Sequence, residues 1–130
     1  MKYLSAYTEA ATTELFNKTG AFFAFSAEQF KEQSTGCKYY SLGGGLYCPQ
    51  ETTEDLREGL STTRADGIAA DIAENGIPAI IRRELSNHEA QITGDLSDTV
   101  AALSDYGIGE SRVRKEYSAY FDECVTNDWF

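Results

Sequence analysis

The sequence predicts an α+β protein in which a small sheet packs against four to five helices. Two segments, 21–25 and 38–48, have the aromatic or glycine-rich composition of strands and tight turns. Most other segments repeat apolar residues every three or four positions, which is the helical period. The chain has 130 residues, of which 42% are hydrophobic, enough for one core. We therefore expect a single domain over residues 1–130.

The N-terminal elements follow from local signals. Residues 5–18 carry a loose apolar stripe that ends before Gly20, which favours a helix with a glycine stop. The aromatic run 21–25 indicates a buried strand. Ser26 and Gln29 have the spacing of a capping box, so a short helix should begin there and end near Gly36.

A hairpin is the next expected element. Residues 38–42 and 46–48 are β-prone and flank Gly43, Gly44 and Gly45, which reach the positive φ angles that tight turns require. Pro49 ends the second strand.

The remainder is predicted to be helical. Between Pro49 and Gly76, apolar residues fall on one face. Gly67 weakens that helix by about 1 kcal/mol relative to alanine, which allows a bend or break there. Further helices are expected from Ile77, over 95–106 and over 110–125.

The charge balance excludes several functions. The 21 acidic residues outnumber the 11 basic ones, giving a formal charge of −10. A surface this negative repels nucleic acid and anionic membranes and attracts basic proteins or metal cations. The first residues lack the pattern of a signal peptide and no apolar run is long enough to span a membrane, so we expect a cytoplasmic protein.

The acids concentrate in one stretch. Residues 51–105 hold twelve acids and four bases, a local charge of −8. On a helix, Glu51, Asp55 and Glu58 share one face, and such a face can occupy a basic groove on another protein. The alternative is that these carboxylates are solvated helix faces or an adaptation to salt. The residues expected to bind a partner are Glu51, Glu54, Asp55, Glu58, Asp66 and Asp71.

A second hypothesis is a small-ligand or nucleotide site. Consecutive glycine amides can cradle a phosphate, and Tyr40 and Arg82 are candidate neighbours of Gly43, Gly44 and Gly45. The run lacks the Lys-Ser/Thr pair of a P-loop, and a hairpin turn already explains it.

A third hypothesis is an enzyme that uses His88 and Glu89 as an acid–base pair. A helix end explains His88 equally well, and no nucleophile motif accompanies it. The odd set Cys37, Cys48 and Cys124 lacks metal-type spacing and indicates free thiols, with a Cys37–Cys48 bridge as the alternative. We expect no cofactor and no metal.

Segments 20–30, 38–49, 84–89 and 93–95 resemble small uncharacterised proteins encoded by bacteriophages and mobile elements. The resemblance spans roughly residues 20 to 120. It implies a compact α+β protein inside a bacterial host cell that interferes with host machinery such as restriction or CRISPR. The resemblance assigns no functional residue. Combined with the acids, it predicts a non-enzymatic interaction protein whose acidic surface occupies a basic site on a host protein.

Overall fold

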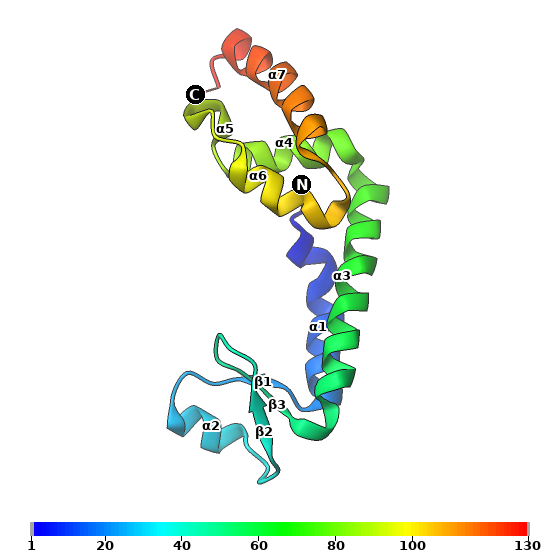
Figure 1. Cartoon of the computed structure of the whole chain (residues 1–130), viewed down its shortest axis with the longest axis vertical. Coiled ribbons are helices and arrows are strands. Elements are labelled where there is room, and N and C mark those ends of the chain that lie inside the picture. The colour runs from blue at the N-terminus through cyan, green and yellow to red at the C-terminus, as the bar shows by residue number, and fades with distance from the viewer. Residues whose placement is uncertain (1, 130) are drawn as a thin grey trace. The chain divides into compact units, whose positions relative to one another are not determined.

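The computed structural model describes residues 2–129, and its internal contacts group the chain into two compact units (Figure 1). One unit is Lys2–Gly67 and the other is Ile68–Phe130, so the boundary falls within one helix. The α+β class is confirmed: the described residues form seven α-helices and a three-stranded antiparallel sheet. That residues 1–130 form a single domain stays a prediction.

The first unit contains the whole sheet. Its elements are α1 (Leu4–Thr19), β1 (Phe22–Phe23), α2 (Ala27–Gln33), β2 (Tyr39–Ser41), β3 (Leu46–Pro49), a 3-10 turn (Gln50–Thr52) and most of α3 (Thr53–Asn75). The second unit contains the end of α3, α4 (Ile77–Asn87), α5 (Ala90–Thr93), α6 (Ser97–Leu103), a 3-10 turn (Ser104–Tyr106) and α7 (Glu110–Asn127). The predicted hairpin and the helices on either side of it are confirmed.

The sheet has the order β1-β3-β2, with β3 in the centre. Phe22 lies opposite Tyr47, and Tyr47 lies opposite Ser41, so these side chains share one face. Helix α2 covers that face with Phe30, whose ring centroid lies 4.9 Å from that of Tyr47. Aromatic packing therefore holds α2 to the sheet.

The capping box predicted at Ser26 begins α2. The Gln29 amide donates to the Ser26 hydroxyl at 3.2 Å. The Gln29 side-chain oxygen accepts from the amide of Phe25 at 2.7 Å, one residue before the position expected for a standard box.

The opposite sheet face helps form the core of the first unit. Cys48 is fully buried there with Ala21 and Leu56. Leu15 and Phe16 of α1 pack around them. This cluster has three buried members, and Phe22 and Ala24 are also buried in the first unit.

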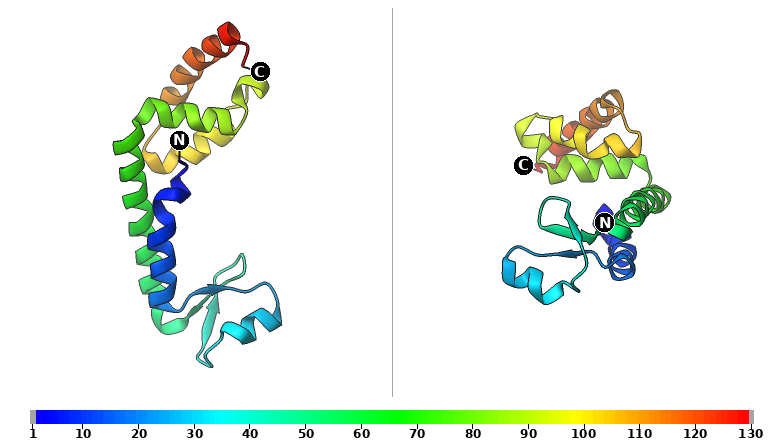
Figure 2. Two further views of the ribbon diagram at one scale, coloured as in Figure 1. Left: turned by 180° about the vertical axis from the view of Figure 1, so that it is seen from behind. Right: turned by 60° about the horizontal axis from the view of Figure 1, so that its bottom comes forward.

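Helices α1 and α3 approach closely and run antiparallel within the first unit (Figures 1 and 2). A Cβ added at Gly59 would meet Leu15 Cδ1 at 2.5 Å, and one added at Gly67 would meet Thr8 Cγ2 at 2.5 Å. Gly67 does not break the helix, since α3 is continuous from Thr53 to Asn75. The glycine is accommodated because it lets α1 pack directly against the α3 backbone.

The second unit has the larger core. Ile80, Ile81 and Leu85 of α4 are fully buried and pack with residues of α6 and α7. Arg82 lies at the side of this core, where its Nε donates to Glu116 at 2.8 Å and its Nη1 donates to Glu123. Throughout residues 2–129, no helix combines the length and the apolar character needed to cross a membrane.

Candidate partner-binding site

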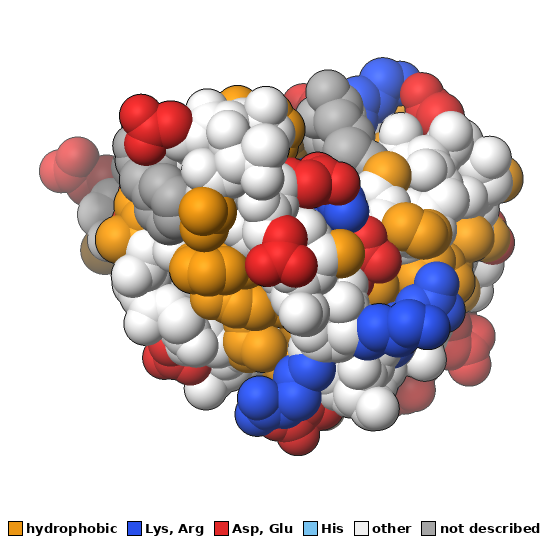
Figure 3. Space-filling model, turned by 90° about the horizontal axis from the view of Figure 1, so that it is seen from above, with side chains coloured by type: hydrophobic (Ala, Val, Ile, Leu, Met, Phe, Trp, Pro, Cys, Tyr) orange, Lys and Arg blue, Asp and Glu red, His pale blue; other side chains and the backbone are white. Residues whose placement is uncertain are grey.

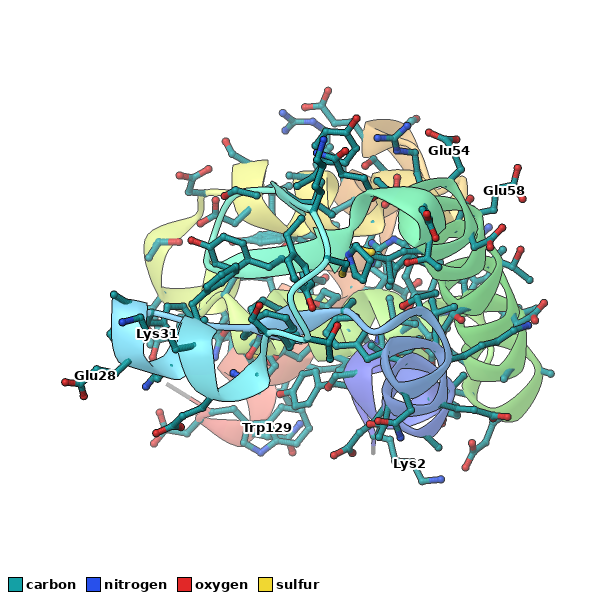
Figure 4. All side chains as sticks on the ribbon, turned by 90° about the horizontal axis from the view of Figure 1, so that it is seen from below. Lys2, Glu28, Lys31, Glu54, Glu58 and Trp129 are labelled. Carbon is teal, nitrogen blue, oxygen red and sulfur yellow. The ribbon has the colours of Figure 1, made fainter. Side chains whose placement is uncertain are left out.

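The start of α3 gathers four of the predicted acidic residues. Glu51 lies in the 3-10 turn that leads into the helix, while Glu54, Asp55 and Glu58 lie in its first two turns. All four are exposed. Figure 4 shows Glu54 and Glu58 projecting outward from the same helix. Exposed carboxylates thus gather at the N-terminal end of α3, while the shared face of Glu51, Asp55 and Glu58 stays a prediction.

Part of this acidity has a structural explanation. Glu54 and Asp55 lie in the first helical turn, where carboxylates interact favourably with the helix dipole. Glu54 also pairs with Arg57 at 2.7 Å, with both side chains highly exposed. Glu58 lies beyond the first turn. Among residues 2–129, neither Asp55 nor Glu58 forms an ion pair, so their charges remain available.

A groove lies beside these two carboxylates, between α1 and α3 of the first unit. It encloses about 550 Å³. Ala11, Leu15 and Gly59 contribute its apolar lining. Its charged lining is formed by Glu14, Lys18, Asp55 and Glu58, with a net charge of −2. Three carboxylates and one amine thus surround an apolar strip, an arrangement that accepts the aliphatic stem and cationic end of lysine or arginine.

Glu14 and Lys18 were not among the predicted site residues. They come from α1, about forty positions before Glu58 in the chain. Their i, i+4 spacing places them on one helix face, but nothing local in the sequence says which face of α1 meets α3. Gly59 and Gly67 are the sequence signal that could have indicated the contact, because small residues on one helix allow another helix to pack closely against it.

Asp66 and Asp71 do not belong to this groove. Asp66 is exposed farther along α3 and does not line it. The expectation that Asp71 contributes to an interaction surface was wrong, because this side chain is fully buried in the second unit. Both Asp71 oxygens accept from Arg83 Nη1 at 3.0 Å.

Two further donors complete the environment of Asp71. The Tyr106 hydroxyl donates to Asp71 Oδ2 at 2.5 Å, and Asn75 donates to Oδ1 at 2.8 Å. Burial alone raises the pKa of Asp71, but the hydrogen bonds from Tyr106, Asn75 and Arg83 outweigh it, so the pKa lies below the usual value. Burial and the bond to Asp71 raise the pKa of Tyr106 to about 12. This is a satisfied interior ion pair.

The residues proposed for a ligand site come from both units, and those of the first unit do not line one common hollow. Gly43, Gly44 and Gly45 have φ angles of 90°, 61° and 85° and form the hairpin turn. Gly45 lines a hollow of about 620 Å³ beside Phe25, Phe30 and Tyr47, but Gly43, Gly44 and Tyr40 do not line it. Arg82 belongs to the other unit, where Glu116 and Glu123 occupy its guanidinium.

His88 ends α4, as the helix-end interpretation predicts. Its Nε2 lies 3.5 Å from Glu84 Oε2. The neighbouring Glu89 adopts a left-handed backbone conformation with φ 53°. Cys37, Cys48 and Cys124 are free thiols, the first exposed and the others buried.

Acidity is not uniform over the molecule. On the face seen in Figure 3, acidic side chains occur singly among neutral, hydrophobic and basic ones. Within residues 51–105, arginines form ion pairs with Glu54, Asp71 and Glu84, and Asp71 is buried. The stretch 51–105 is therefore not one continuous negative surface. The carboxylates of this stretch that are exposed and form no ion pair with another described residue include Asp55 and Glu58 at the start of α3.

The fold and this groove define a small, mainly helical α+β protein with an acidic interhelical surface. A family model described as a family of unknown function (DUF7659) matches residues 4–123, and the chain belongs to this family. No curated protein and no solved structure matches the chain.

Proposed function

We propose that this chain is a non-enzymatic interaction protein that uses the groove between α1 and α3 to bind lysine and arginine side chains of a basic partner protein. The observation that carries this proposal is the convergence of carboxylates from two helices on one apolar strip. Glu14 comes from α1, and Asp55 and Glu58 come from α3.

The composition of the groove favours protein cations over small metal ions. A metal ion needs several oxygen ligands at short range, whereas this groove is about 550 Å³ in volume and partly apolar. A lysine or arginine side chain buries its methylene stem on such a strip while its charged end meets the carboxylates. Lys18 adds a repulsive element, so we expect spaced basic residues to bind better than a continuous block.

The resemblance to bacteriophage and mobile-element proteins makes basic, nucleic-acid-binding proteins of bacterial defence the first partners to test. In that setting the protein acts in the cytoplasm of the host cell, and the α3 carboxylates take the place of nucleic-acid phosphates. Glu51 and Glu54 extend the acidic face beyond the groove.

Neutralising the groove tests the proposal. We expect Asp55→Asn combined with Glu58→Gln to weaken binding of an arginine-rich peptide by about tenfold, because each exposed charge contact contributes up to about 1 kcal/mol. Binding is measured by fluorescence anisotropy at low and high salt. The wild-type affinity should fall as salt screens the contacts.

A matched control is available on α2 of the same unit. Glu28 and Glu32 are exposed, and Glu28 lies in the first turn of α2 as Asp55 does in α3. Glu28→Gln combined with Glu32→Gln produces the same change in net charge. Equal weakening by both pairs would show attraction to overall charge and would contradict a specific groove.

A further inference from the structure

The outer edge of β2 presents backbone groups that the sheet does not use. The amide of Gln50 donates to the carbonyl of Lys38 at 2.9 Å, and the amide of Leu42 donates to the carbonyl of Leu46 at 2.8 Å. In an antiparallel pair the direction of these bonds alternates along the strand, so Tyr39 and Ser41 turn their N–H and C=O groups away from β3. Within residues 2–129, these outward groups have no backbone partner.

Exposed apolar side chains accompany this edge. Tyr40 and Leu42 point to the same sheet face and are 49% and 41% exposed. An open edge beside exposed apolar side chains is a template for pairing with another strand.

The charge distribution favours a second copy of this chain at this edge. Residues 21–49 contain two acids, Glu28 and Glu32, and two bases, Lys31 and Lys38, so their net charge is zero. The whole chain carries −10, and two copies therefore repel each other over most of their surface. The neutral segment that contains β2 lacks this repulsion.

We propose that β2 pairs with β2 of a second copy in an antiparallel, two-fold contact centred on Tyr40. The two sheets then become one continuous sheet of six strands, twice the three of a single chain. The contact is isologous, which means that β2 of each copy forms one half of the interface.

The register follows from the free backbone groups. Tyr39 lies opposite Ser41 of the second copy, and the two such pairs use every outward N–H and C=O of the strand. The two Tyr40 side chains become neighbours, with Cβ atoms about 4.5–5.5 Å apart. Lys38 lies opposite Leu42 of the second copy, where its methylene stem covers the leucine without placing like charges together.

Sedimentation over a wide concentration range tests the contact. We expect the wild-type chain to shift from monomer to dimer, and Ser41→Pro to weaken the dimer by at least about tenfold, because proline removes an outward N–H that β3 does not use. Phe25→Ser is the control for nonspecific hydrophobic association, since Phe25 is 74% exposed but lies outside β2. This control should leave the dimer unchanged.

Charge complementation provides a second test that does not depend on the proline variant folding. We expect Tyr40→Lys and Tyr40→Glu to be monomeric separately, because like charges then face each other across the two-fold axis. An equal mixture of the two should restore a heterodimer that weakens with salt. A wild-type chain that stays monomeric throughout, or a dimer that none of these Ser41 and Tyr40 substitutions changes, overturns the proposal.

Discussion

The ion pair between Asp71 and Arg83 is buried inside the second unit. Both side chains are almost fully inaccessible to solvent, and every oxygen of Asp71 accepts a hydrogen bond. Removing one member of such a pair leaves the other charge buried without compensation. The pair therefore constrains how α3, α4 and the turn at Tyr106 pack. Replacing both members by apolar groups of similar size would cost less stability than removing one of them.

We expect Asp71→Asn to lower the free energy of unfolding by about 3–5 kcal/mol at neutral pH, as measured by urea denaturation. The pH dependence should also change. The pKa of Asp71 is depressed in the folded state, so its stabilisation is present above the unfolded value of about 3.9 and is lost as pH falls toward the folded pKa. The Asp71→Asn variant should not show this loss of stability at acidic pH, because it has no carboxylate at position 71.

Asp66→Asn is the matched control for this prediction. Asp66 lies on the same helix but is exposed. Its substitution should change the unfolding free energy by no more than about 0.5 kcal/mol. A similar small change for Asp71→Asn would show that the interior pair contributes little.

At the scale of elements, the contact between α1 and α3 reverses the usual effect of glycine in a helix. Gly67 to alanine normally stabilises a helix by about 1 kcal/mol. Here the new Cβ would lie 2.5 Å from Thr8 Cγ2, and the β-branched threonine is restricted in how it can move. We expect Gly67→Ala to destabilise the protein in thermal or urea unfolding.

A double substitution isolates the cause. Thr8→Ala removes the methyl group that the new Cβ meets, so the Gly67→Ala/Thr8→Ala protein should regain stability relative to Gly67→Ala alone. Ser61→Ala, at an exposed position of the same helix, measures the effect of helix propensity without the contact. Stabilisation by Gly67→Ala comparable to that by Ser61→Ala would contradict the close approach.

The same contact illustrates what could be predicted from the sequence. The hairpin around Gly43–Gly45 and the cap at Ser26 were predictable, because both depend on residues within a few positions of each other. The role of Gly67 was not, since helix propensity gives its cost but not the helix packed against it. The partners of Asp71 were missed for the same reason: Arg83 and Tyr106 lie 12 and 35 positions away.

Of the acidic groove, the α3 residues could be predicted from the sequence, but the α1 residues could not. Helical spacing alone places Glu51, Asp55 and Glu58 on one face. The contribution of Glu14 and Lys18 depends on the long-range pairing of α1 with α3. Charge counting likewise treated Asp71 like its exposed neighbours, because burial is not visible in a tally of residue types.

At the scale of the whole molecule, the two units have unequal cores. Ten buried hydrophobic residues lie in Ile68–Phe130, whereas five lie in Lys2–Gly67. Burial of apolar surface is the main favourable contribution to folding, so the first unit should open at a lower free energy than the second. The groove between α1 and α3 and the open edge of β2 both belong to the first unit.

Hydrogen exchange on two core variants tests this inequality. Leu56 is 1% exposed in the first core and Leu85 is fully buried in the second. Truncation of either to alanine should cost about 2–5 kcal/mol. We expect Leu56→Ala to accelerate exchange in α1, α2 and the sheet while α4–α7 remain protected, and Leu85→Ala to accelerate exchange in α4–α7. Equal acceleration of exchange in both units by Leu56→Ala would contradict this prediction, because it would mean that the chain opens as one cooperative body. In that case, a partner bound at the groove would protect α4–α7 against opening as much as it protects α1.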